Sequence, residues 1–162
     1  MLSIPWHLFT YENTPEFSMN GQECVGRVVN IHDGDTLTIV LPVFTSFFRF
    51  SVRLAGIDTC ETTSKNPENM KLATDACLRL FSLVTNDVVT SVKEIKPFLR
   101  HNICLVHVNC LDFDKYGRLL ADVSKSKDTV PFSKILVDEK LAYVYDGGKK
   151  LTETEQLKLF RE

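Results

Sequence analysis

Residues 27–42 read RVVNIHDGDTLTIVLP, and this stretch decides the fold. Two runs rich in β-branched residues, 27–31 and 36–41, flank the tetrapeptide His32-Asp33-Gly34-Asp35. An Asp-Gly pair between two such runs is a strong signal for a β-hairpin, because these residues tolerate the backbone of a tight turn. The stretch therefore predicts two antiparallel strands joined at the tetrapeptide.

A third strand is expected over residues 48–54, which read FRFSVRL. Its apolar residues alternate with Arg49, Ser51 and Arg53. Alternation with a period of two sends successive side chains to opposite faces, so one face packs on a core and the other carries guanidinium groups. The polar face of this strand is a candidate functional surface.

Helices and further strands follow this unit. A helix is predicted to begin at Asn66-Pro67, because Asn is a preferred cap and proline suits the first helical position. Further strands are expected at 88–92, 103–109 and 118–123, and further helices at 131–140 and from the capping box Thr152-Glu153-Thr154-Glu155. This order indicates an α+β, mainly β fold, with a five-stranded OB-fold barrel and about three packed helices.

Length and composition are those of one folded domain. The chain has 162 residues, of which 44% are hydrophobic and 25% charged, and this suffices for a compact core. Residues 1–22 are rich in aromatic residues but broken by Pro5 and Pro15, so we expect an N-terminal arm or extension there. Residues 23–162 are then the domain, which we expect to be a monomer.

Charge and cysteine content exclude several classes of protein. The formal net charge of −2, from 19 basic and 21 acidic residues, excludes nucleic-acid binding by bulk positive charge alone, so any phosphate binding must be local. The five cysteines form no Cys-x-x-Cys pair, which argues against a disulfide framework and a zinc knuckle. The sequence has no signal-peptide pattern and no apolar run of ~20 residues, which predicts a soluble, intracellular (cytoplasmic) protein without a membrane partner.

Three short strings contain the residues that could do chemistry, namely 33–36 (DGDT), 53–62 (RLAGIDTCET) and 114–118 (DKYGR). Each string by itself is most often a turn or a helix cap. Taken together, Asp35, Asp58 and the carbonyl of Thr59 offer the hard oxygen ligands that Ca²⁺ or Mg²⁺ requires, with other positions left to water and phosphate. The strings therefore indicate a metal-assisted phosphodiesterase.

Three charged side chains could complete such a site. Glu61 lies three residues beyond Asp58, where it could act as a general base on a water beside the metal. Arg53 and Arg118 offer planar, bidentate donors to phosphate oxygens and to the charge of a five-coordinate transition state. Strict alternation would send Arg53 and Asp58 to opposite faces, so we expect a bend between them at Gly56.

The three strings, in this order and followed by Ala142-Tyr143-Val144-Tyr145, resemble the staphylococcal nuclease (thermonuclease) family from about Gly26 to the C-terminus. The resemblance implies an OB-fold barrel with helices and a Ca²⁺-dependent nuclease. Such an enzyme cleaves DNA and RNA at the 5′-oxygen side of the phosphate and leaves 3′-phosphate ends. Mg²⁺ and Mn²⁺ are the alternative metals.

The resemblance also implies a role for each motif residue. Asp35 and Asp58 fall on the calcium carboxylates of the family, and Thr59 on its calcium-binding carbonyl. Glu61 falls on the residue that orients or deprotonates the attacking water, while the two catalytic arginines correspond to Arg53 and Arg118. Positions that line the nucleotide site, where tyrosine can stack on a base or donate to phosphate, correspond to Lys115, Tyr116, Tyr143 and Tyr145. The expected partner is a DNA or RNA substrate.

Two departures from the family pattern bear on the site. Cys60 stands where the family has proline, and its place between Thr59 and Glu61 predicts an exposed thiol beside the metal site. The stretch Glu94–Asn102 lengthens the segment before DKYGR, and this extension would either reshape the groove or form a longer hairpin.

Two other functions agree with parts of the pattern. A catalytically silent OB-fold module could bind nucleic acid or protein, but it has no need for two carboxylates that repel phosphate when no metal is bound. An OB domain stabilised by a structural Ca²⁺ would use the carboxylates and leave Arg53 and Arg118 unexplained. The complete set of residues therefore favours an active nuclease.

Overall fold

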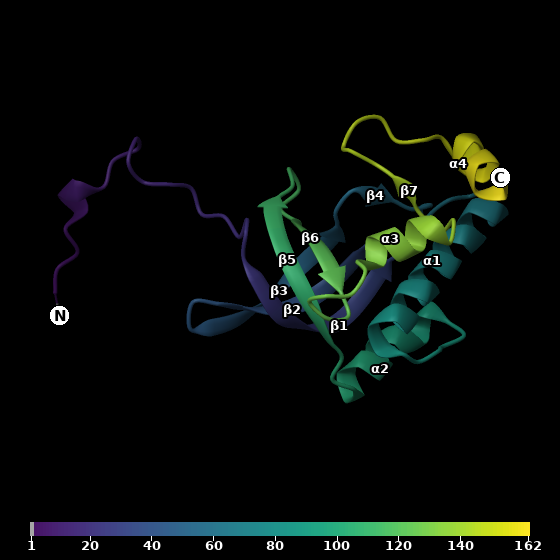
Figure 1. Ribbon diagram of the computed structural model, residues 1–162, viewed down its shortest axis with the longest axis horizontal. Helices are drawn as coiled ribbons and strands as arrows, with labels where there is room; N and C mark the ends of the chain where they lie inside the picture. Colours follow the sequence, from purple (N-terminus) through teal and green to yellow (C-terminus); the bar gives the residue numbers. More distant parts are fainter. Residues whose placement is uncertain (1) are drawn as a thin grey trace.

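The strands on either side of the Asp-Gly turn form the first part of a closed β-barrel (Figure 1). In the computed structural model, which describes residues 2–162, five strands close in the order β1-β2-β3-β6-β5. They are β1 (Glu23–Asp33), β2 (Thr36–Val43), β3 (Ser46–Leu54), β5 (Leu105–Phe113) and β6 (Leu119–Ser124). Neighbouring strands are antiparallel except β3 and β6, which are parallel. The mainly β, α+β barrel expected from the sequence is confirmed.

The turn between β1 and β2 is held from both sides. Asp33 pairs with Thr36 across the hairpin, and the amide of Leu54 in β3 donates to the carbonyl of Asp35 at 2.8 Å. The apolar residues at alternate positions of β2 and of the end of β3 are buried, namely Leu37, Ile39, Leu41, Val52 and Leu54. This burial fixes the register, because a shift by one residue would turn the whole set outward.

Four α-helices are present in the described residues, and they lie on one side of the barrel (Figure 1). They are α1 (Pro67–Thr85), α2 (Ile95–His101), α3 (Phe132–Asp138) and α4 (Glu153–Arg161). The predicted caps are confirmed, because Asn66 Oδ1 accepts from the amide of Glu68 at 2.9 Å and Thr152 forms a capping box with Glu155. None of these helices is long and apolar enough to cross a membrane.

The strand predicted at 88–92 is wrong, and α2 was not predicted. The carboxylate of Glu94 accepts hydrogen bonds from the amides of Thr90 and Ser91 at 3.0 and 2.9 Å, which makes a capping box around the short 3₁₀-helix η2 (Val92–Glu94). This cap starts a helical segment that buries Ile95 and Leu99, so it overrides the β-propensity of the preceding valines. The extension at 94–102 is therefore a helix, not a longer hairpin.

A second, two-stranded sheet connects the barrel to the C-terminal part of the chain. β4 (Ile57–Asp58) pairs with β7 (Tyr143–Val144) in antiparallel fashion, with Asp58 opposite Tyr143. The chain thereby brings together residues that lie far apart in the sequence.

The N-terminal arm leaves the barrel before β1 and extends away from it (Figure 1). Its last residues are tied to β5, because the amide of Cys110 donates to the carbonyl of Gln22 at 2.8 Å. Residues 2–18 are exposed and include the short 3₁₀-helix η1 (Trp6–Leu8). The division between arm and domain at residue 22 stays a prediction.

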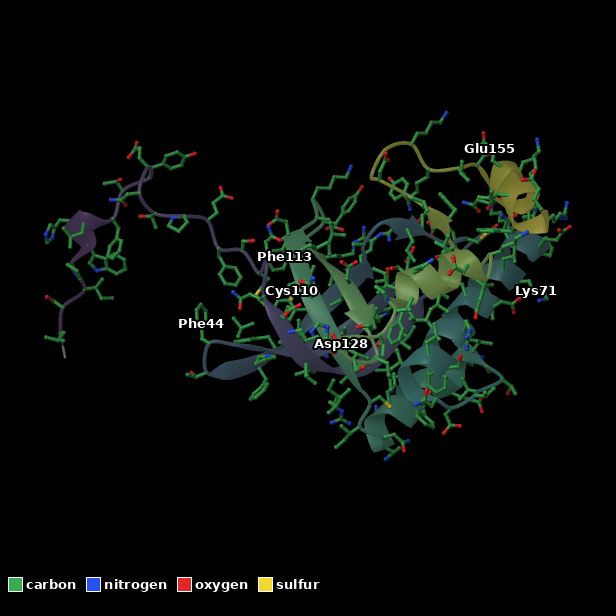
Figure 2. The ribbon with its side chains drawn as sticks, in the orientation of Figure 1. Phe44, Lys71, Cys110, Phe113, Asp128 and Glu155 are labelled. Atoms are coloured by element: carbon green, nitrogen blue, oxygen red, sulfur yellow. The ribbon has the colours of Figure 1, made fainter. Side chains whose placement is uncertain are left out.

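One aromatic contact joins the arm to the barrel. The ring of Phe17 lies 6.2 Å from that of Phe44 and 6.4 Å from that of Phe113, measured between centroids. Phe44 and Phe113 both lie toward the end of the barrel from which the arm leaves (Figure 2). Phe17 therefore contacts the barrel on the side away from the helices.

Gly34 allows the hairpin turn to lie directly against α1. A Cβ atom at this position would come within 2.5 Å of Ala76 Cβ, and Ala76 is a buried residue of α1. Gly34→Ala must therefore push the turn and the helix apart. We expect the free energy of unfolding to fall by about 1–3 kcal/mol, measured by urea denaturation. An unchanged unfolding midpoint would contradict the close contact.

Candidate active site

The turn after β3 brings Arg53 and Asp58 together. β3 ends at Leu54, Gly56 has a φ of 78°, and β4 begins at Ile57. The backbone reverses at this left-handed position, as the sequence predicted, and places Arg53 Nη2 3.0 Å from Asp58 Oδ1. Arg53 Nη1 also donates to the carbonyl of Ile57 at 3.1 Å. The guanidinium therefore closes the turn that carries the second carboxylate.

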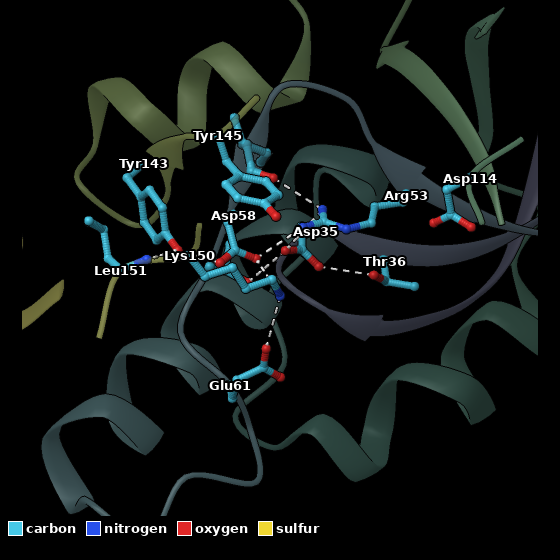
Figure 3. A network of polar contacts seen from close by, with 12 residues as sticks. Asp35, Thr36, Arg53, Asp58, Glu61, Asp114, Tyr143, Tyr145, Lys150 and Leu151 are labelled. Atoms are coloured by element: carbon cyan, nitrogen blue, oxygen red, sulfur yellow. Dashed lines mark hydrogen bonds and ion pairs between the residues drawn. The ribbon is translucent and has the colours of Figure 1, made fainter. Parts of the chain in front are cut away.

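The same guanidinium reaches the first carboxylate. Arg53 Nη1 lies 3.3 Å from Asp35 Oδ2, and both side chains are more than nine-tenths buried (Figure 3). Two hydroxyl groups complete the surroundings of Asp35, because Thr36 Oγ1 donates to Oδ1 at 2.9 Å and Thr59 Oγ1 donates to Oδ2 at 3.2 Å. Burial raises the pKa of Asp35, while Arg53 and Thr36 oppose that shift. One arginine thus forms ion pairs with two buried carboxylates.

Tyr143 holds the other oxygen of Asp58. Its hydroxyl donates to Asp58 Oδ2 and accepts from the amide of Leu151 at 3.3 Å. Burial and the neighbouring carboxylate raise the pKa of Tyr143, so the hydroxyl keeps its proton. Tyr143 is only 5% exposed, and its hydroxyl orients Asp58, while its role as a nucleotide-site residue stays a prediction.

Lys150 enters the site, which the sequence did not predict. Its Nζ lies 3.3 Å from Asp58 Oδ1 and 3.4 Å from Glu61 Oε1 (Figure 3). Although burial opposes it, the charges of these two carboxylates raise the pKa of Lys150. After Gly147-Gly148 the sequence suggests only a solvated turn, and no local signal links position 150 to Glu61.

Arg118 lies just before β6 on the turn that was expected there. The carboxylate of Asp114 organises this turn, because its Oδ1 accepts from the amides of Tyr116 and Arg118 and its Oδ2 pairs with Arg118 Nε at 2.7 Å. Burial alone would raise the pKa of Asp114, but the hydrogen bonds from Arg118 and Tyr116 outweigh it and lower this pKa. The guanidinium also lies 5.4 Å from the centroid of the Tyr116 ring, and within residues 2–162 its two Nη groups donate no hydrogen bond, so they remain for another acceptor. Asp114 is thus a positioning residue that sequence reasoning missed.

These residues surround one small, polar cavity of about 50 Å³. Its lining includes six predicted site residues, namely Asp35, Arg53, Asp58, Thr59, Glu61 and Arg118, together with Lys150, Asp33, Thr36 and Cys60, whereas Tyr143 and Asp114 lie behind it. A larger cavity of about 590 Å³ adjoins it and shares Arg53, Arg118 and Lys150. Lys115, Tyr116 and Tyr145 line the larger cavity, whereas Tyr143 does not.

The prediction that Cys60 is an exposed thiol is wrong. Its side chain is buried, and Asn69 of α1 donates a weak hydrogen bond to Sγ at 3.8 Å. Asn69 also donates to the carbonyl of Glu153 and to Gln156 Oε1, both at 3.1 Å, so α1 and α4 meet over this loop. Burial raises the pKa of the Cys60 thiol, which makes it a poor nucleophile.

The donor set suits a hard cation that keeps open positions. Within residues 2–162, no three His, Cys, Asp or Glu side chains gather closely enough to form a complete metal site. Asp35, Asp58 and Glu61 carry one more charge than Arg53 and Lys150 neutralise, and Thr59, which has a neutral carbonyl oxygen, lines the same cavity. Oxygen donors in this number match Ca²⁺ or Mg²⁺ with further ligands from water and phosphate. Asp35, Asp58 and Thr59 therefore could hold such an ion.

A family model described as staphylococcal nuclease homologue matches residues 51–162. The chain belongs to this family. The matched segment contains Arg53, Asp58, Glu61 and Arg118, and the family is consistent with the nuclease-type barrel fold of the chain. The match begins after β2, so Asp35 lies outside the matched segment. No curated protein matches the chain.

Tyr143→Phe tests the contact beneath Asp58. The substitution removes the hydroxyl and leaves a buried carboxylate oxygen with one donor fewer. We expect the free energy of unfolding to fall by about 1–3 kcal/mol, the cost of an unsatisfied buried charged group. Tyr116→Phe is the matched control, because the Tyr116 ring is 72% exposed. Equal unfolding midpoints for the two variants in urea would contradict the assigned role.

Proposed function

We propose that this protein is a Ca²⁺-dependent nuclease that hydrolyses phosphodiester bonds of DNA, RNA or both. One observation carries the proposal: Asp35, Asp58, Glu61, Arg53 and Arg118 come from separate strands and turns and line a single polar cavity. Phosphodiester hydrolysis needs carboxylates that hold a cation, an exposed carboxylate that reaches water and arginines that contact phosphate. Membership of the staphylococcal nuclease family supports the same reaction class.

The metal would be held by Asp35, Asp58 and the carbonyl of Thr59. When bound, Ca²⁺ supplies Lewis-acid polarisation of a phosphate oxygen, and Mg²⁺ or Mn²⁺ are the alternatives. Arg53 keeps both carboxylates in place from the inner side, through contacts of 3.0 and 3.3 Å. The hydroxyl of Thr59 donates to Asp35, so the residue that offers its carbonyl also fixes a carboxylate.

Glu61 is the proposed general base. Its side chain is exposed at the mouth of the polar cavity, where water has access, unlike the buried Asp35 and Asp58. Lys150 holds it on the same side as Asp58. Glu61 would take a proton from the water that attacks phosphorus. The bond from phosphorus to the 5′-oxygen would break, which leaves a 3′-phosphate and a 5′-hydroxyl group that takes its proton from solvent.

The two arginines are proposed to act differently. Arg53 is buried and paired with both carboxylates, so most of its donors are already engaged. Arg118 is held by Asp114 through Nε alone, which leaves its Nη groups to contact phosphate oxygens. Arg118 is therefore the better candidate for stabilising the extra charge of the transition state. Lys115, Tyr116 and Tyr145 would contact the adjoining nucleotide from the larger cavity.

The test is incubation of the purified monomer with plasmid, single-stranded DNA and RNA, in Ca²⁺, Mg²⁺ or excess chelator. We expect cleavage in Ca²⁺ and its loss in chelator. Glu61→Gln keeps the size of the side chain and should lower the rate by about 10²–10⁴-fold, because it removes the base. Cleavage that persists in chelator, or an unchanged rate in the variant, would contradict the mechanism. Absence of cleavage with every metal would favour a silent binding module.

Arg118→Lys separates charge from geometry. Lysine keeps the positive charge but loses the planar fork and the Nε contact with Asp114. We expect kcat to fall by roughly 10²-fold or more, while the Kd for a short oligonucleotide changes much less. Rate and affinity are measured at one fixed salt concentration, because phosphate binding is salt-dependent. Equal losses in both would identify Arg118 as a phosphate anchor only.

A further inference from the structure

A basic groove lies between α2 and the outer face of β1, β2 and β3. It has a volume of about 420 Å³, and its lining includes Arg27, His32, Thr38, Arg49, Lys96 and Arg100. No acidic side chain lines it. Lys96 and Arg100 come from α2, the helix formed by the extension at 94–102, so this extension supplies half of the cationic groups.

The cations of the basic groove have no acidic partner. In the described part of the chain, Arg53, Arg79, Arg118 and Arg161 each form an ion pair with a carboxylate. The other three arginines of the described residues form no ion pair, and they are Arg27, Arg49 and Arg100. All three line the groove, together with Lys96, which also forms no ion pair. In a chain with a net charge of −2, this is a local concentration of positive charge.

Backbone groups fix one side of the groove. Arg27 Nη2 donates to the carbonyls of Leu99 and Arg100 at 3.2 and 3.4 Å. These carbonyls are neutral, so they position Arg27 and tie α2 to β1 without cancelling the charge. The groove is therefore built by the fold, and it does not depend on the rotamers of surface lysines alone.

The register of the sheet connects the basic groove to the active site. Val40 of β2 pairs with Arg27 on one side and Arg49 on the other. Four residues back along β2, and on the same face of the sheet, Thr36 pairs with Arg53. Four residues of an antiparallel strand span about 14 Å, so Arg49 and Arg53 lie that far apart on one continuous surface. A single OB fold commonly covers ~4–16 nucleotides, which exceeds what the polar cavity alone can hold.

We propose that the basic groove binds the phosphate backbone of single-stranded nucleic acid at nucleotides remote from the scissile bond. The choice of ligand rests on the proposed function, whereas the binding itself requires neither metal nor cleavage. Arg49 and Arg100 are exposed and supply phosphate contacts, and Arg27 fixes the wall of the groove. Binding energy from remote nucleotides would favour long substrates over short ones.

Binding in excess chelator tests the proposal on the full chain. The probe is a fluorescent 20-nucleotide single-stranded DNA, and anisotropy is measured over a range of salt concentrations. The groove variant is R49Q with R100Q; the control is K93Q with K158Q, which removes the same charge from two exposed, unpaired lysines outside the groove. We expect the groove variant to bind roughly tenfold more weakly, with a salt slope shallower by about 1.4, the value for two lost contacts.

Each outcome decides a separate question. Equal losses in the groove and control variants, with circular dichroism spectra like that of the parent, would overturn the proposal, since charge alone would explain them. Displacement of the probe by polyglutamate as readily as by unlabelled DNA would also overturn it, because an acidic protein would then suit the groove equally. Groove-dependent binding without cleavage in any metal would contradict only the proposed nuclease function. Cleavage with unchanged binding in the groove variant would contradict only the groove.

Discussion

The buried guanidinium of Arg53 is the contact on which the rest of the site depends. It reaches Asp35 at 3.3 Å, Asp58 at 3.0 Å and the carbonyl of Ile57 at 3.1 Å. Taking two carboxylates out of water costs several kcal/mol per ion unless they are paired, so Arg53 makes their burial possible. Together with Glu61 these carboxylates carry three negative charges, against the two positive charges of Arg53 and Lys150. The excess favours a further cation near Asp35 and Asp58, which is the electrostatic basis of the proposed metal binding.

The C-terminal part of the chain completes this site from outside the barrel. The β4–β7 ladder places the hydroxyl of Tyr143 on Asp58, and the following loop brings Lys150 to the same carboxylate. This loop is held in turn by α4, which meets α1 through the amide of Asn69. Packing between two helices that carry none of the proposed catalytic groups therefore fixes the position of Asp58.

The two cationic regions of the molecule differ in how their charges are compensated. At the polar cavity each arginine is paired with a carboxylate, which neutralises much of its charge even where, as in Arg118, the Nη groups remain for phosphate. In the basic groove no carboxylate pairs with Arg49 or Arg100, and phosphate meets no competing carboxylate. Affinity for a long substrate and chemistry on one bond can therefore reside in separate places joined by the outer face of β3.

The sequence by itself determined the barrel strands around the Asp-Gly turn, the cap of α1 and the bend at Gly56, because these depend on local backbone preferences and on alternation. It also indicated the residues of the polar cavity, although their roles there stay predictions. Tertiary structure alone decided that Cys60 is buried and that Lys150 reaches Glu61, since both depend on segments about 90 residues away in the chain. The helix Ile95–His101 depends on both, because the capping box of Ser91 and Glu94 is local in the sequence, whereas the burial of Ile95 and Leu99 depends on packing against the barrel. Local preferences act over a few residues, whereas burial and charge pairing depend on which distant segments the fold brings together.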